Sequence, residues 1–135
     1  MCGILGVVSQ NNLQIELHQF NTALNSIEHR GPDDFGLFEV KNAILGMRRL
    51  SIMDVSTGKQ PASSHSGRFK VVFNGEIYNY KDLISQQFGA QTPKFSEAEL
   101  IANLYEKEGL ECITKFEGFF AIAIFDTYTS ELILI

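Results

Sequence analysis

The chain has 135 residues, 44% of them hydrophobic, and carries a formal net charge of −5 at pH 7. A chain of this length supports one globular domain with a substantial core. Its charges are scattered and form no basic stripe, which argues against a nucleic-acid partner. The longest apolar run, from Gly118 to Phe125, is too short to cross a bilayer, so we expect no membrane partner.

The two cysteines indicate a reducing compartment. Cys2 and Cys112 could form at most one disulfide, and the N-terminus lacks the basic region of a secretory signal. We therefore expect a cytoplasmic protein with free thiols, in which Cys112 fills a core position. Residues 131–135 form an apolar, strand-like run. Because natural domain ends are usually polar, we expect a domain that is truncated at its C-terminus.

The first half of the chain predicts a strand, a helix and a pair of strands. The apolar run 4–8 is typical of a strand that enters a core. Apolar residues then fall at alternating spacings of four and three, which predicts an amphipathic helix: Leu13, Leu17, Phe20, Leu24 and Ile27. The link between the strand-like stretches 35–40 and 42–50 is too short for a crossover helix, so we expect antiparallel pairing. Residues 51–67 are expected to form a loop.

The second half predicts further strands and two helices. A strand at 69–73 ends on Asn74-Gly75, which is a turn signal. Ser96 and Glu99 have the spacing of a capping box, so a helix begins after Ser96 and ends near Gly109. The remaining expected elements are a helix at 80–88, a short helical segment at 110–115, and strands at 119–125 and from 132 onward. The strand at 119–125 is apolar almost throughout and needs cover on both faces. Together these elements predict a layered α+β fold with mainly antiparallel sheets.

Cys2 is the first candidate for chemistry. Removal of Met1 would place a thiol and a free α-amine on the same residue. An α-amine titrates near ~7.7–8.0, which suits a general base at neutral pH. One residue could then supply both the nucleophile and the proton acceptor. The alternative interpretation is that Cys2 is a small apolar residue at the start of a buried strand.

Asn74 and Gly75 are candidates for an oxyanion hole. An asparagine amide and a neighbouring glycine N–H can converge on one oxygen, and glycine lets the backbone approach a ligand closely. The alternative is an ordinary Asn-Gly hairpin turn, although no second strand follows at hairpin spacing.

Arg49 and Glu97 are candidates for substrate recognition. Arg49 lies where a strand runs into a loop and could bind a carboxylate through two parallel hydrogen bonds. It could also be a surface arginine in a weak salt bridge. Glu97 could receive an ammonium group, or it could simply complement the dipole of the helix that it begins.

The three histidines and the remaining polar residues give weaker signals. His29 could serve as a base to a cysteine, whereas His18 and His65 have no natural partner in the sequence. No His/Cys/Asp cluster has metal-ligand spacing, so we expect no metal site. Neither common glycine-rich phosphate loop occurs, so ATP is not expected to bind these residues.

Taken together, these residues closely resemble the glutaminase domain of class II glutamine amidotransferases, which are N-terminal-nucleophile hydrolases. The nearest branch is the N-terminal domain of glutamine-hydrolysing asparagine synthetases. The matching segments are Met-Cys-Gly-Ile at 1–4, His-Arg-Gly-Pro-Asp at 29–33, Arg-Leu-Ser-Ile at 49–52, Gly58 through Gln60-Pro61, Asn-Gly-Glu-Ile-Tyr-Asn at 74–79, and the strand at 118–126. The resemblance implies that residues 1–135 form one glutaminase domain, an αββα sandwich of two mainly antiparallel sheets between helices.

The resemblance also implies a mechanism. Cys2 would attack the side-chain amide of L-glutamine while its own α-amine moves protons. Asn74 and the Gly75 N–H would hold the oxyanion. Hydrolysis of the resulting thioester would give glutamate and ammonia.

The same resemblance implies a set of substrate-binding residues. Arg49 would bind the α-carboxylate of glutamine, and Glu76 would help to hold the α-amino end. The segment after Arg49 would shape that side of the pocket: Leu50, Ser51, Ile52 and Met53. Glu97 stands where the family usually has an aspartate that binds the α-ammonium. Glutamate is one methylene longer than aspartate, and a shift of about an ångström can lower a reaction rate on the order of 10²-fold when it disturbs the positioning of the substrate.

The resemblance places the use of ammonia outside these residues. The family passes ammonia to a synthetase or other acceptor domain, which this sequence lacks, and ATP and Mg²⁺ are expected only there. The glutaminase domain itself is expected to need no cofactor. Apolar surface left exposed without that domain would favour a homo-oligomer. Two alternatives are a non-catalytic regulatory or interaction domain and an amidotransferase that acts on a surface-polysaccharide sugar.

Overall fold

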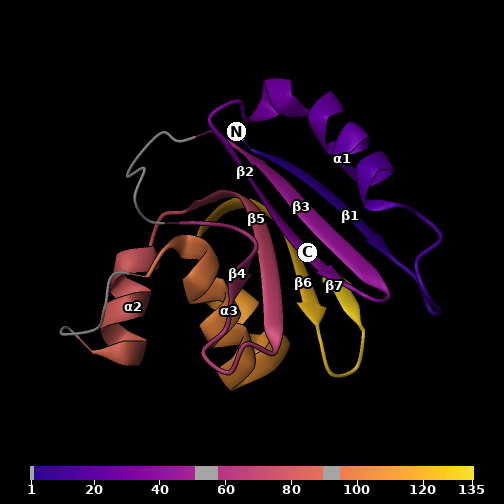
Figure 1. The fold of residues 1–135 in the computed structure, drawn as a ribbon. Coiled ribbons are helices and arrows are strands. Elements are labelled where there is room, and N and C mark those ends of the chain that lie inside the picture. The colour runs from indigo at the N-terminus through magenta and orange to yellow at the C-terminus, as the bar shows by residue number, and fades with distance from the viewer. Residues whose placement is uncertain (1, 51–57, 90–94) are drawn as a thin grey trace.

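The computed structural model describes residues 2–50, 58–89 and 95–135. Its strands form two sheets, one with the order β1-β3-β2 and one with the order β4-β5-β6-β7, and every pair is antiparallel (Figure 1). The strands are β1 Gly3–Val8, β2 Asp34–Val40, β3 Ala43–Arg49, β4 Ala62–Ser63, β5 Phe69–Ile77, β6 Gly118–Asp126 and β7 Leu132–Leu134. The helices are α1 Leu17–Ser26, α2 Tyr80–Phe88 and α3 Glu97–Glu108, with 3₁₀ segments η1 Glu28–Arg30 and η2 Gly109–Lys115.

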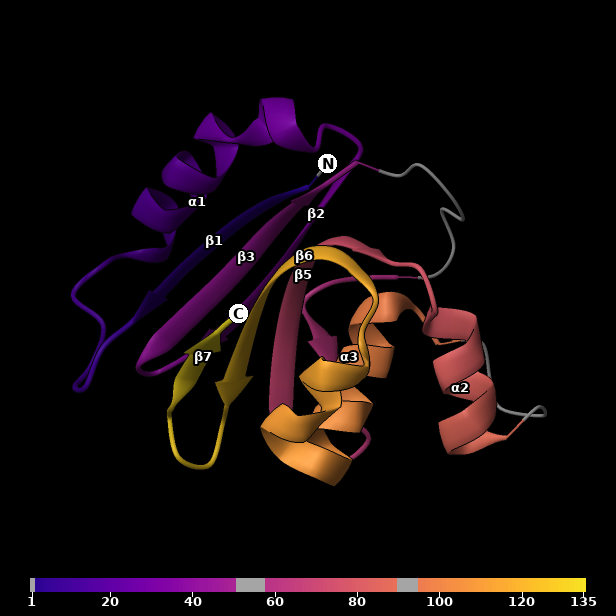
Figure 2. The same ribbon diagram turned by 180° about the vertical axis from the view of Figure 1, so that it is seen from behind.

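The two sheets pack face to face, and helices cover both outer faces (Figures 1 and 2). Apolar side chains of β3 meet those of β5 and β6 between the sheets: Ala43, Leu45, Met47, Val72, Ala123 and Phe125. On the outer face of the three-stranded sheet, Phe20 and Leu24 of α1 pack against Ile44. On the outer face of the other sheet, α2 and α3 bury residues such as Leu83 and Leu104. The expected αββα sandwich is confirmed.

Local signals placed α2 and α3 correctly. α2 runs from Tyr80 to Phe88, as the sequence predicts. The Ser96 Oγ accepts a hydrogen bond from the Glu99 N–H at 3.3 Å, and the Ser96 N–H donates to Glu99 Oε2 at 2.8 Å, which completes the capping box. α3 ends at Glu108 and is capped by Gly109, whose φ of 63° is in the left-handed region that glycine adopts readily. None of the described helices is long and apolar enough to span a membrane.

α1 begins at Leu17, later than the apolar spacing indicates. The Glu16 N–H donates to Gln19 Oε1 at 3.0 Å, so the helix is capped at Glu16. Leu13 precedes the helix and its N–H donates to the Lys41 carbonyl oxygen at 3.1 Å. It still packs against the α1 core, and for this reason its spacing imitates that of a helical residue.

β5 is longer than the sequence predicts, and it pairs with a short strand that the sequence does not predict. It continues through Asn74-Gly75 to Ile77 and pairs with β6 over its whole length, from Phe69 opposite Asp126 to Ile77 opposite Gly118. The hairpin-turn interpretation of Asn74-Gly75 is therefore wrong. The expected loop 51–67 also contains the short strand β4, which pairs with Lys70 and Val71 of β5.

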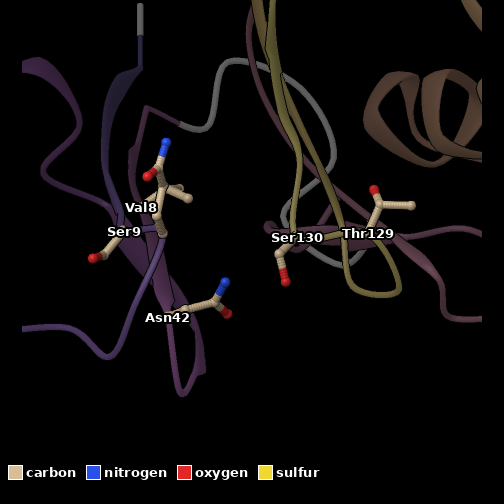
Figure 3. A pocket seen from close by; sticks show the side chains of 6 residues that line it. Val8, Ser9, Asn42, Thr129 and Ser130 are labelled. Atoms are coloured by element: carbon tan, nitrogen blue, oxygen red, sulfur yellow. The ribbon is translucent and has the colours of Figure 1, made fainter.

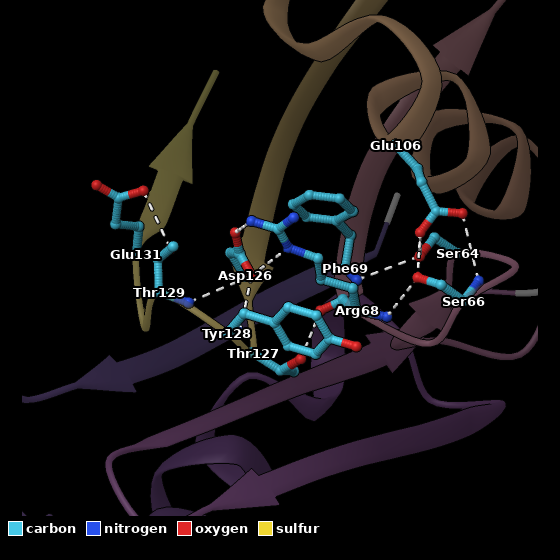
Figure 4. A network of polar contacts seen from close by, with 10 residues as sticks. All are labelled: Ser64, Ser66, Arg68, Phe69, Glu106, Asp126, Thr127, Tyr128, Thr129 and Glu131. Atoms are coloured by element: carbon cyan, nitrogen blue, oxygen red, sulfur yellow. Dashed lines mark hydrogen bonds and ion pairs between the residues drawn. The ribbon is translucent and has the colours of Figure 1, made fainter.

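An ion pair joins Arg68, directly before β5, to Asp126, the last residue of β6, at the end of the four-stranded sheet that carries the β6–β7 turn (Figure 4). The Nε and Nη2 of Arg68 donate to the two carboxylate oxygens of Asp126 at 2.9 and 2.6 Å. The guanidinium carbon lies 4.9 Å from the ring centroid of Phe69 and 5.0 Å from that of Tyr128. Asp126 is 3% exposed, and the hydrogen bonds from Arg68 are the main cause that lowers its pKa to about 2.

We expect Asp126→Asn to lower the free energy of unfolding by about 2 kcal/mol near neutral pH, because it removes charge-assisted hydrogen bonds to a buried group. The folded-state pKa of Asp126 lies below its usual 3.8. Its stabilising contribution is therefore complete above that value and is lost as the pH falls toward about 2. Thermal unfolding of both proteins between pH 2 and 7 measures this.

The matched control is Glu131→Gln. Glu131 is an exposed carboxylate in the same turn, and its Oε2 accepts one hydrogen bond from Thr129 Oγ1 at 3.1 Å. A change of less than about 0.5 kcal/mol is expected there. Equal losses in the two variants would contradict a specific role for the Arg68–Asp126 pair.

Candidate active site

Cys2 lies directly before β1, and its side chain lies between the two sheets. Its side chain packs against the inter-sheet cluster together with Ile4. β1 pairs with β3 so that Gly3 lies opposite Arg48. One step further along this antiparallel register sets Cys2 beside Arg49, the last residue of β3.

Arg48 and Arg49 project to opposite faces of the three-stranded sheet, because successive side chains of a strand alternate. Arg48 faces α1. Its Nε donates to the Leu24 carbonyl oxygen at 3.4 Å, its Nη2 donates to the Asn25 side chain, and its Nη1 lies 3.6 Å from Glu28 Oε1. Arg48 is 9% exposed. Because Arg48 is fixed to α1, Arg49 projects to the inner face, which also carries Cys2.

Asn74 approaches Cys2 from the other sheet. It lies two residues after Val72, which faces the inter-sheet core, so the alternation of β5 turns Asn74 to the same side. The Cys2 N–H donates to Asn74 Oδ1 at 2.8 Å, across 72 residues of sequence. Since Oδ1 accepts this bond, the Nδ2 donor of the carboxamide is turned away from the Cys2 nitrogen.

Two glycines let β5 and β6 approach each other beside Asn74. Gly75 has a φ of 153°, and a β-carbon there would overlap the Phe119 carbonyl oxygen. Gly118 has a φ of 156°, and a β-carbon there would overlap the Glu76 carbonyl oxygen. Sequence reasoning selected Gly75 but missed Gly118. The available signal was a glycine that opens an otherwise apolar strand.

Glu97, the first residue of α3, is bound to the end of β5. Its Oε1 accepts a hydrogen bond from the Ile77 N–H at 2.6 Å. Burial raises the pKa of Glu97; the Ile77 N–H lowers it, and the nearby charge of Glu76 raises it further. The net effect is a raised pKa, so this carboxylate takes up a proton more readily than an ordinary glutamate.

Arg49 reaches the start of α3. A β-carbon on Gly58 would lie 3.2 Å from Arg49 Nη2 and 3.6 Å from the β-carbon of Ser96. Gly58 has a φ of 92°, where a side chain is disfavoured. The guanidinium of Arg49 and the N-terminal turn that carries Glu97 therefore lie at the same end of the sandwich.

The structure brings most of the predicted site residues together at this end. Glu76 is exposed and follows Asn74 on the same face of β5. Leu50 is half-buried directly after β3. Three other predicted binding residues, Ser51, Ile52 and Met53, lie outside the described residues.

His29 lies on the other side of β1. It is exposed within η1. A β-carbon on Gly3 would lie 3.0 Å from Ile27 and 3.2 Å from Arg30, so the outer face of β1 meets this segment. Cys2 instead packs on the inner face. This arrangement gives no support to His29 as a base for the Cys2 thiol.

A hollow of about 360 Å³ lies at the end of β1 opposite to Cys2 (Figure 3). Its lining comes from the end of β1, the β2–β3 turn and the β6–β7 turn: Val8, Ser9, Gln10, Asn42, Thr129 and Ser130. All six side chains are uncharged. Sequence reasoning did not identify this hollow, because its walls come from turns that are far apart in the chain.

Within the described ranges, no group of three or more His, Cys, Asp or Glu residues is arranged to hold a metal ion.

Both cysteines are free thiols. The buried Cys112 has a pKa raised to about 12, mainly by burial, so this thiol stays protonated at neutral pH. Cys2 is the more exposed of the two.

The fold and site together define a sandwich of the N-terminal-nucleophile hydrolase type, with a cysteine between its sheets at the head of the first strand. A family model described as the glutamine amidotransferase domain matches residues 1–135, and the chain belongs to this family.

Several relatives are asparagine synthetases. The chain is 33% identical to "Asparagine synthetase [glutamine-hydrolyzing] 2" of Bacillus subtilis, over 100% of this chain and 18% of that protein. It is 37% identical to "Asparagine synthetase B [glutamine-hydrolyzing]" of Escherichia coli, over 94% and 23%. It is 36% identical to a putative asparagine synthetase of Methanocaldococcus jannaschii, over 93% and 28%. The chain therefore spans less than a third of the length of these relatives.

We expect Gly75→Ala to destabilise the fold by about 2 kcal/mol or more. The new β-carbon would overlap the Phe119 carbonyl oxygen, and alanine disfavours the φ of this position. Gly67→Ala is the matched control. Gly67 also has a positive φ, of 80°, but a β-carbon there would meet nothing within 4 Å. The free energy of unfolding of that variant should fall by about 1 kcal/mol. Chemical denaturation of both variants gives the comparison, and similar losses would contradict the close approach of β5 and β6.

Proposed function

We propose that this chain hydrolyses L-glutamine to glutamate and ammonia through a glutamyl thioester on Cys2. The observation that carries the proposal is the hydrogen bond from the Cys2 nitrogen to Asn74. It joins a thiol-bearing residue to a carboxamide whose Nδ2 donor is turned away from the Cys2 nitrogen. Membership of the glutamine amidotransferase family supports the same reaction.

The first half of the reaction forms the thioester. Removal of Met1 frees the α-amine of Cys2, which takes the thiol proton directly or through one water. The Sγ attacks the side-chain carbonyl carbon of glutamine, and the oxyanion is held by Asn74 Nδ2 and the Gly75 N–H. The protonated amine gives its proton to the leaving nitrogen. The C–N bond breaks, and ammonia leaves.

The second half regenerates the enzyme. A water molecule gives a proton to the α-amine and attacks the thioester carbonyl carbon, and the same donors hold the oxyanion. The C–S bond breaks, glutamate leaves, and the thiolate recovers its proton. Overall, one glutamine and one water give one glutamate and one ammonia. No step needs a cofactor; ATP and Mg²⁺ belong to the acceptor reaction.

The charges at this end of the sandwich complement the zwitterionic end of glutamine. Arg49 binds the α-carboxylate through two parallel hydrogen bonds. Glu76 and Glu97 hold the α-ammonium. The segment after Arg49 shapes the carboxylate side of the pocket: Leu50, Ser51, Ile52 and Met53.

We further propose that the ammonia serves an asparagine-synthetase-type acceptor domain. The relatives named above are glutamine-hydrolysing asparagine synthetases, and this chain matches only a part of each. Transfer to a sugar is the alternative acceptor reaction.

The first test is the intact mass of the chain after incubation with a diazoketone analogue of glutamine. We expect loss of Met1 and one covalent adduct, because the analogue occupies the glutamine pocket and alkylates the thiolate. Cys2→Ala should show no adduct, and Cys112→Ala, the matched thiol control, should label normally. Loss of Met1 without an adduct would contradict the catalytic proposal and favour a non-catalytic regulatory domain.

The second test is the pH dependence of glutamine binding. Glu97 must be ionised to hold an ammonium, and its pKa is raised above the usual 4.5 of a glutamate. As the pH falls, KM should therefore begin to increase at a higher pH than it would with an ordinary glutamate. Glu97→Gln should raise KM by about 10-fold or more, the equivalent of one charge-assisted hydrogen bond. It should also flatten this pH dependence.

Glu111→Gln removes an exposed carboxylate from η2 and controls for the change in net charge. It should leave KM unchanged across the pH range. A KM profile that Glu97→Gln does not alter would show that another group, such as Glu76, binds the α-ammonium.

A further inference from the structure

Gln60 bonds to the backbone of β5 directly before Asn74. Its Oε1 accepts a hydrogen bond from the Phe73 N–H at 2.6 Å. β4 does not pair with this part of β5, since Ala62 lies opposite Val71 and Ser63 opposite Lys70. The side chain of Gln60 therefore supplies the acceptor that a neighbouring strand would otherwise provide.

Beyond the part of β5 that pairs with β4, the Phe73 N–H shares its edge with the N–H groups of Gly75 and Ile77. Backbone N–H groups of a strand alternate in direction, so those of Phe73, Gly75 and Ile77 point to the edge away from β6. Gln60 accepts from the first of them, and Glu97 accepts from the third at 2.6 Å. The Gly75 N–H, the proposed oxyanion donor, lies between these two fixed points.

The main chain of Gln60 contacts the other sheet. A β-carbon on Gly36 of β2 would overlap the Gln60 carbonyl oxygen and lie 3.3 Å from Pro61 Cδ. The backbone of Gln60 therefore lies directly against β2, while its side chain binds β5. One residue thus spans the two sheets at the end that carries Cys2 and Asn74.

We propose that Gln60 is a positioning residue for glutamine hydrolysis, because it fixes the β5 edge that presents Asn74 and the Gly75 N–H to the reacting carbonyl. The proposal rests on the function proposed above. Gln60 acts through β5 and does not touch the substrate. A displacement of about an ångström in the oxyanion donors can cost on the order of 10²-fold in rate.

The test compares two substitutions at Gln60. Gln60→Met keeps the length of the side chain but cannot accept the Phe73 N–H, and we expect kcat to fall by about 10- to 100-fold. KM should stay within about twofold, since Arg49 and Glu97 bind the other end of glutamine. Gln60→Glu keeps an acceptor at the same place and should recover most of kcat.

Asn103→Leu is the matched control for lost stability. The Asn103 Oδ1 accepts the His65 N–H at 2.8 Å, which, like the bond at Gln60, runs from a backbone N–H to a side-chain carboxamide oxygen. This variant should lower Tm by a similar amount without changing kcat. If kcat follows Tm equally in both variants, or if Gln60→Met keeps the wild-type kcat, the proposal is overturned.

Amide hydrogen exchange, read by NMR, tests the same proposal without catalysis. In Gln60→Met, the Phe73 and Gly75 amides should exchange at least about 10-fold faster, while the Val71 amide keeps its rate. Unchanged exchange at Phe73 would overturn the proposal even if the enzyme is active. If the wild-type chain does not hydrolyse glutamine at all, the proposed function fails, and the role of Gln60 in fixing β5 is still decided by this exchange.

Discussion

The hydrogen bond between the Cys2 nitrogen and Asn74 Oδ1 is the contact on which the candidate site depends. It joins β1 of one sheet to β5 of the other, so it exists only when both sheets have formed and packed. The apolar cluster between the sheets, with Met47 on one side and Val72 on the other, sets their separation. The hydrophobic core and the site geometry are therefore consequences of the same packing.

Alternation along the strands decides which side chains take part. Arg48 is held by α1, and its neighbour Arg49 consequently projects to the inner face of the three-stranded sheet. On β5, Asn74 follows Val72 on the inner face, while Phe73 packs into the helical side of the sheet. A shift of one residue in either register would exchange these roles and disperse the site.

The two ends of the sandwich are fixed in different ways. At the far end, the Arg68–Asp126 pair and its aromatic neighbours hold the β6–β7 turn (Figure 4). At the end that carries Cys2, the side chains of Gln60 and Glu97 bind the edge of β5 beyond its pairing with β4, where no strand among the described residues pairs with it. The backbone N–H groups on either side of Gly75 are thus held by side chains and not by a pairing strand.

The sequence alone determined the features that depend on local physics. The capping box at Ser96 and the limits of α2 follow from neighbouring residues, and the pattern at residues 1–4, 49–52 and 74–79 was specific enough to indicate the family. Local spacing misplaced the start of α1, because Leu13 packs like a helical residue from outside the helix. Only the tertiary structure decided that Asn74-Gly75 is part of a strand, since β6, more than 40 residues later, supplies the pairing. It alone brought Cys2, Arg49, Asn74 and Glu97 to one end of the sandwich, because long-range contacts depend on how the sheets pack and not on the residues beside each side chain.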